Sequence, residues 1–103
     1  MISPLEVFQK EYPELQQAYA IVINTLMKSE VLDSKTKQLI YIAIKVVTDD
    51  ENAIKYHIPM AKTAGATRDE IKEVIALSIT VNGLKGISKF LPEALEIYDN
   101  LNK

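Results

Sequence analysis

The chain has 103 residues, of which 48% are hydrophobic and 25% are charged, a composition that is typical of one globular domain and argues against disorder. The formal net charge is −2, and the basic residues are interleaved with acidic ones, which argues against nucleic acid as a partner. With no cysteine and one histidine, the chain offers no disulfide or thiolate, and its mainly carboxylate ligand set disfavours a zinc or iron site.

We therefore expect a single domain over residues 1–103. No apolar run approaches the roughly 20 residues that span a bilayer, so we expect no membrane partner. The first residues, MISPLEVFQK, lack the basic start and apolar core of a signal peptide. Cytoplasmic residence is the expectation by default.

The first third of the chain predicts two helices. Ser3, Pro4 and Glu6 are typical of the N-cap, first position and capping-box partner of a short helix. Pro13 begins a longer helix with an apolar stripe of helical period. The stripe consists of Leu15, Ala18, Tyr19, Val22, Ile23 and Leu26.

A third helix is expected after a connection at residues 29–33, with Asp33 or Ser34 as its cap. It contains LIYIAIKVV, in which Lys45 is the only charged residue. Length and β-branched content would also suit a buried strand, and periodicity does not separate the two. Helix is favoured because the lead-in at residues 34–38 is polar and capped, and because the chain offers no partner strand.

The run Asp49, Asp50, Glu51 begins a fourth helix that Gly65 ends. Acidic residues at a helix start are favoured by the helix dipole, and the spacing differs from that of an EF-hand loop, so we interpret the run as capping. Thr67 and Glu70 form a capping box that opens a fifth helix.

Gly83 closes the fifth helix, and residues from Gly86 to about Leu101 form a last helix or a turn plus a helix, interrupted or restarted at Pro92. The stretch GLKG, residues 83–86, could offer backbone N–H groups to an anion, but a helix-ending turn is the preferred interpretation. The sequence contains no nucleotide-binding loop and no serine nucleophile motif.

Two segments, Leu39–Val47 and Ile71–Val81, are apolar on more than one helical face. Such helices must be buried on all sides, which a small protein does most easily by self-association. A compact monomer with two central helices is the alternative.

His57 is the candidate for chemistry, because it shares a helix face with Ile54, Ile58 and Ala61. An imidazole among apolar side chains favours its neutral form and could transfer a proton in a sheltered site. It could equally be a core histidine that is satisfied by a backbone carbonyl. Pro59 should kink this helix and free the Lys55 carbonyl beside the histidine, which either shapes a pocket or only accommodates packing.

From Leu32 to Asn100 the chain resembles the carboxymuconolactone decarboxylase and alkylhydroperoxidase D-like family. The resemblance lies in the lead-in KTKQLI at residues 35–40, the apolar helix after it, His57, and the turn AGATRDEI at residues 64–71. It implies an all-α bundle, here of about five to six helices, which assembles as a dimer, trimer or hexamer.

Peroxidase members of this family carry a glutamate on the third helix and a Cys-x-x-Cys pair followed by the histidine. The matching positions here are Gln38, Asp50, Ala53 and His57. Without a thiolate the peroxidase mechanism has no nucleophile, so thiol peroxidase activity is not expected.

The decarboxylase branch uses neither cysteine nor cofactor, and its acid–base chemistry stays open to this chain. The expected function is therefore cofactor-free chemistry on a small carboxylated metabolite. His57 would transfer the proton, Gln38 would polarise through a hydrogen bond, and Asp50 would be a charge partner about 10 Å away along the helix axis. A non-catalytic, ligand-binding or structural homo-oligomer is the competing hypothesis.

Overall fold

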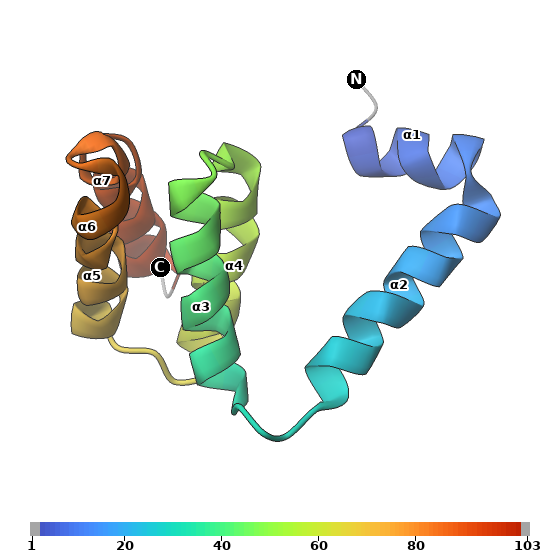
Figure 1. The fold of residues 1–103 in the computed structure, drawn as a ribbon, viewed down its shortest axis with the longest axis horizontal. Coiled ribbons are helices and arrows are strands. Elements are labelled where there is room, and N and C mark those ends of the chain that lie inside the picture. Colours follow the sequence, from blue (N-terminus) through green and yellow to red (C-terminus); the bar gives the residue numbers. More distant parts are fainter. Residues whose placement is uncertain (1–2, 102–103) are drawn as a thin grey trace. The chain divides into compact units, whose positions relative to one another are not determined.

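A computed structural model of the chain describes residues 3–101, and it is helical almost throughout, with no strand among these residues (Figure 1). The all-α class is thereby confirmed. The chain divides between Val31 and Leu32 into two compact units. The first unit holds α1 (Pro4–Glu11) and α2 (Pro13–Lys28), and the second holds α3 (Ser34–Val47), α4 (Glu51–Thr63), α5 (Arg68–Leu77), α6 (Ile79–Asn82) and α7 (Lys85–Asn100).

The first unit begins as the sequence predicts. The Ser3 hydroxyl accepts a hydrogen bond from the Glu6 N–H at 3.2 Å, and Pro13 opens α2. The ring of Phe8 lies 6.4 Å from that of Tyr12 and 6.3 Å from that of Tyr19. No residue of α1 or α2 is buried, so the apolar stripe of α2 is left uncovered within this unit.

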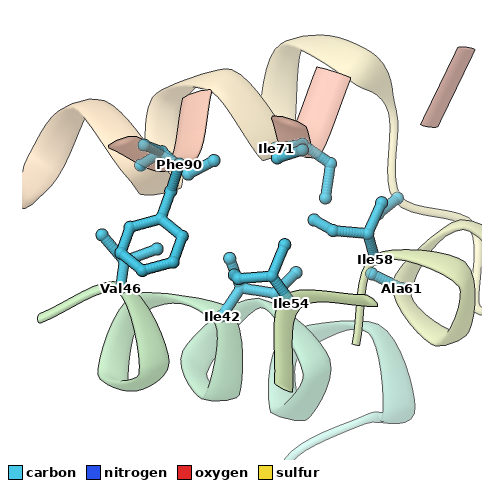
Figure 2. Packing of buried hydrophobic residues seen from close by; sticks show 10 residues of the cluster. Ile42, Val46, Ile54, Ile58, Ala61, Ile71 and Phe90 are labelled. Atoms are coloured by element: carbon cyan, nitrogen blue, oxygen red, sulfur yellow. The ribbon is translucent and has the colours of Figure 1, made fainter. Parts of the chain in front are cut away.

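The second unit is a bundle of four longer helices. α3 packs against α4 and α5, and α7 packs against the same two helices, so each helix has two neighbours around a shared core (Figure 2). The core residues come from every wall of the bundle: Ile42, Val46, Ile54, Ile58, Ala61, Ala66, Ile71, Ile75, Phe90 and Ala94.

The predicted caps of the second unit are confirmed. The Asp33 carboxylate accepts from the Thr36 N–H at 2.7 Å, which makes Asp33 the N-cap of α3. Thr67 and Glu70 form the reciprocal capping box of α5. Gly65 follows α4 with a φ of +101°, a left-handed conformation that favours glycine after a helix C-terminus.

The start of α4 differs in detail from the prediction. Asp50 is its N-cap, and its carboxylate accepts from the Ala53 N–H at 3.2 Å. Asp49 lies in the preceding turn, with a φ of +64°. Lys89 of α7 pairs with both Asp49 and Glu51 at 2.6 Å, so the outer two acids tie the α3–α4 turn to α7.

The fifth helix does not run unbroken to Gly83, because it ends at Ser78 and restarts as the one-turn α6. The Ser78 N–H bonds the Ile75 carbonyl at 3.1 Å, and its hydroxyl donates to the same oxygen at 2.7 Å. An i−3 turn therefore replaces the i−4 pattern of the α-helix at this point. The extra break gives seven helices within residues 3–101, more than the sequence predicted.

The expected interruption at Pro92 was wrong, since α7 is continuous from Lys85 to Asn100. Proline removes the hydrogen bond to the carbonyl four residues earlier, here that of Ser88. Ser88 and Pro92 are both exposed, so water can satisfy this carbonyl and the helix continues.

Candidate functional site

The centre of the candidate site is a hydrogen bond between α3 and α4. Gln38, only 7% exposed, lies on α3, and its amide oxygen Oε1 is 2.8 Å from Nδ1 of His57 on α4. Because an amide oxygen can only accept, Nδ1 must carry the proton. The neutral imidazole then keeps its free lone pair on Nε2.

Nε2 of His57 is accessible. Within residues 3–101 the hydrogen bond of the imidazole is made through Nδ1. The one fully buried side-chain nitrogen or oxygen of this part of the chain that lacks a partner is Asn82 Oδ1. Nε2 therefore reaches the surface, where it can accept a proton from solvent or from a ligand.

The environment of His57 favours the neutral imidazole. The Tyr41 ring stacks on the imidazole, with centroids 5.3 Å apart and planes at 29°. Partial burial lowers the pKa of His57, the positive charge of Lys45 lowers it further, and the negative charge of Asp50 opposes both. At neutral pH the side chain is thus an uncharged base.

The structure does not bring Asp50 to the imidazole. Its carboxylate caps α4 and pairs with the Lys45 ammonium at 3.5 Å, and among the described residues it makes no hydrogen bond to His57. Of the three predicted site residues, Gln38 and His57 meet directly, and Asp50 acts on the imidazole only through its charge.

Sequence reasoning missed Tyr41 and Lys45 as members of this site. They follow Gln38 by three and seven positions, so the three residues share one face of α3. That spacing was a usable signal, because Lys45 is the only charged residue within an apolar run. The sequence did not show which helix this face of α3 would contact.

The sequence left open whether Pro59 shapes a pocket beside His57 or only accommodates packing, and the expected Lys55 carbonyl does not lie beside the histidine. α4 is continuous through Pro59, and residues 55 and 57 lie about 200° apart around a helix, so the freed Lys55 carbonyl is on the side away from the imidazole. Pro59 instead lines a hollow of about 330 Å³ with Lys62, Thr63 and Leu101.

Three further hollows of the second unit lie at residues 48–52, between α4 and α7, and between α5 and Leu91. His57 lines none of these four hollows. In one chain the site therefore lies where α3 meets α4, outside these four hollows.

No three side chains among the histidine, aspartate and glutamate residues of the described part of the chain converge as a metal site would require. None of the helices between residues 3 and 101 combines the length and the apolar character that crossing a membrane requires.

The chain is similar to proteins of one family in both sequence and structure. The model of the carboxymuconolactone decarboxylase family matches residues 13–96. An uncharacterized protein of Methanocaldococcus jannaschii is 30% identical over 98 residues, covering 94% of this chain and 90% of the relative. An uncharacterized protein of Cupriavidus necator is 28% identical over 90 residues, covering 87% of this chain and 79% of the relative.

A solved structure is also similar. The crystal structure of an apo carboxymuconolactone decarboxylase family protein from Legionella pneumophila matches with a TM-score of 0.84 and 30% identity, covering 96% of this chain and 88% of that one.

Proposed function

The chain belongs to the carboxymuconolactone decarboxylase family, and we propose that it is a cofactor-independent enzyme that performs decarboxylase-type acid–base chemistry on a small carboxylated metabolite. The observation that carries the proposal is the Gln38–His57 hydrogen bond of 2.8 Å. It supports a neutral imidazole whose accessible Nε2 can exchange protons with a ligand.

Decarboxylation requires a proton at a defined step. The C–C bond to the carboxylate breaks, CO₂ leaves, and the electron pair remains on the substrate carbon. Without a cofactor, the substrate itself must hold this pair in a conjugated carbonyl. A proton then adds to the carbon, and His57 would deliver it from Nε2 after taking it up from solvent.

The surroundings suit His57 to this role. Because burial and Lys45 lower the pKa of His57, its protonated form is a stronger acid than an ordinary imidazolium and gives up the proton more readily. Gln38 would hold the ring and its tautomer, as hydrogen-bonded partners of catalytic histidines do. Gln38 itself transfers no proton, since an amide does not titrate in this range.

The enzyme hypothesis is tested by carboxymuconolactone turnover, measured as CO₂ release, in the parent protein and in His57→Gln. Glutamine keeps a polar side chain of similar length, so circular dichroism should show an unchanged fold. Turnover that is lost in His57→Gln, with the fold intact, would support the assignment. Equal turnover in both proteins, or none in the parent with this lactone and a panel of conjugated keto and lactone acids, would retire it.

Self-association is part of the proposal. Apolar side chains of α3 and of the α5–α6 segment are exposed in one chain, among them Ile40 at 42%, Ile44 at 48% and Val81 at 67%. Covering several hundred Å² of such surface would contribute several kcal/mol, at roughly 25 cal/mol per Å². The residues of α2 add a second uncovered surface.

Light scattering at low micromolar concentration should show a dimer or a larger species. Ile44→Asp should shift the protein toward smaller species, whereas Ser88→Asp, an exposed change on α7, should not. A parent protein that is monomeric at this concentration would contradict self-association.

The second candidate function is a non-catalytic, ligand-binding or structural homo-oligomer. The observation in its favour is that His57 lines none of the four hollows described above. Native mass spectrometry of freshly purified protein distinguishes the candidates in part, because it reports subunit number and any co-purified small molecule together. A ligand-free oligomer without turnover would favour the structural role.

A further inference from the structure

Two rows of side chains, all polar except Ala53, run along α3 and the start of α4. Gln38, Tyr41 and Lys45 follow one face of α3 at spacings of three and four residues, and Asp50, Ala53 and His57 repeat the same spacings on α4. The two helices form a hairpin and run in opposite directions (Figure 1). Gln38 therefore meets His57 at one end and Lys45 meets Asp50 at the other, and we call these six residues the α3–α4 seam.

Lys45 is notable in this seam because, among residues 3–101, its acidic partner is Asp50 alone and the ion pair between them is weak. The Lys45–Asp50 ion pair spans 3.5 Å, and the two side chains are 34% and 43% exposed. Exposed pairs of this kind contribute about 0–1 kcal/mol. The Asp50 carboxylate also caps α4 through the Ala53 N–H, so it keeps a partner if the ammonium turns to another anion.

The spacing of the seam defines what could lie along it. Seven residues separate Lys45 from Gln38, which is about 10 Å along a helix axis, and the flexible lysine stem can shorten that span. Tyr41 lies between them with its ring already stacked on His57.

We propose that Lys45 binds the carboxylate of a small planar organic acid, whose body lies against Tyr41 and whose far end reaches Nε2 of His57. This proposal deepens the proposed function by naming the residue that recognises the acid. Binding of the acid is independent of that function, and only the proton transfer by His57 rests on it. The ammonium supplies the charge complement, the tyrosine ring supplies a flat apolar surface, and the imidazole supplies the proton-transfer group.

The single histidine of the chain makes the proposal directly measurable. In protein labelled with ¹⁵N and ¹³C, the imidazole signals belong to His57 alone. The probe is benzoate, a planar carboxylate, and benzamide is its uncharged counterpart of the same shape. Benzoate bound at Lys45 brings a negative charge toward the imidazole, so it should shift the His57 signals saturably and raise the His57 pKa. Benzamide should do neither at the same concentration.

Three variants locate the binding group. Lys45→Met keeps the length of the side chain without its charge and should weaken the benzoate response at least 5-fold. Lys45→Arg should retain it, and Lys55→Met, an exposed lysine on another face of α4, should match the parent. Retention of the Nδ1–H signal pattern in each variant shows that the seam is still assembled.

An undiminished benzoate response in Lys45→Met would overturn the proposal, and so would an equal loss in Lys55→Met or an equal response to benzamide. None of these outcomes decides the turnover test on His57→Gln, which is a separate measurement. Conversely, a benzoate response that depends on Lys45 in a protein without turnover would support the binding site. The same result would contradict the enzyme hypothesis alone.

Discussion

Replacing Gln38 by glutamate should convert His57 from a neutral base into a cation near neutral pH. The amide oxygen of Gln38 lies 2.8 Å from Nδ1, so a carboxylate there would place a charge roughly 4 Å from the centre of the imidazolium. Two unit charges at about 4 Å attract by about 4 kcal/mol at an effective dielectric constant of about 20. At about 1.4 kcal/mol per pKa unit, this is an upper limit of about 3 units.

Part of that attraction is offset, because Gln38 is 7% exposed and burying a carboxylate at this position costs free energy. We therefore expect Gln38→Glu to raise the His57 pKa by about 1–3 units. The assay is a pH titration of the His57 imidazole by NMR. The control is Gln38→Met, which keeps the shape, removes the acceptor and should not raise the pKa. A rise of less than about 0.5 unit in Gln38→Glu would refute the inferred contact between the two side chains.

Gly86→Ala should destabilise the fold by about 1–3 kcal/mol in urea unfolding. The added methyl group would lie 2.6 Å from Ser78 Oγ and 2.7 Å from Val46 Cγ1. An unchanged unfolding midpoint would show that these side chains move aside at no cost in free energy. Because the folded-state pKa of His57 lies below the value of 6.5 for an unperturbed histidine, the unfolded chain binds more protons below pH 6.5. The melting temperature of the parent should therefore fall relative to that of His57→Gln as the pH drops through 6.5 toward the folded pKa, and parallel curves would contradict the assignment. Purified protein should consume no peroxide above a buffer blank with a dithiol reductant, because the chain has no cysteine that could cycle through a sulfenic acid or a disulfide; consumption would reveal a different mechanism.

Local features of the fold were readable from the sequence. The caps at Asp33 and Thr67 depend on residues three positions apart, and the structure forms both. The break at Ser78 was not readable, because serine often continues a helix. α7 also approaches this position so closely that a methyl group at residue 86 would force a neighbouring side chain to move. The continuity of α7 through Pro92 depends likewise on which side of the helix faces water.

The candidate site was readable only in part. His57 was predicted from its place on an apolar helix face and Gln38 from the family resemblance, and their hydrogen bond joins residues 19 positions apart. Tyr41 and Lys45 belong to the site because of the register in which α3 meets α4. A helical face seen in one segment does not specify that register, which is set by the packing of the whole bundle.

Gln38 holds His57 as a neutral imidazole with its proton on Nδ1 and its lone pair on Nε2. A long-range ¹H–¹⁵N correlation spectrum of the parent protein at pH 7.5 reads this tautomer directly, because the chain has one histidine. We expect Nδ1 at the position of a protonated ring nitrogen and Nε2 at that of an unprotonated one. A spectrum with the proton on Nε2, or with both nitrogens protonated, would contradict the account.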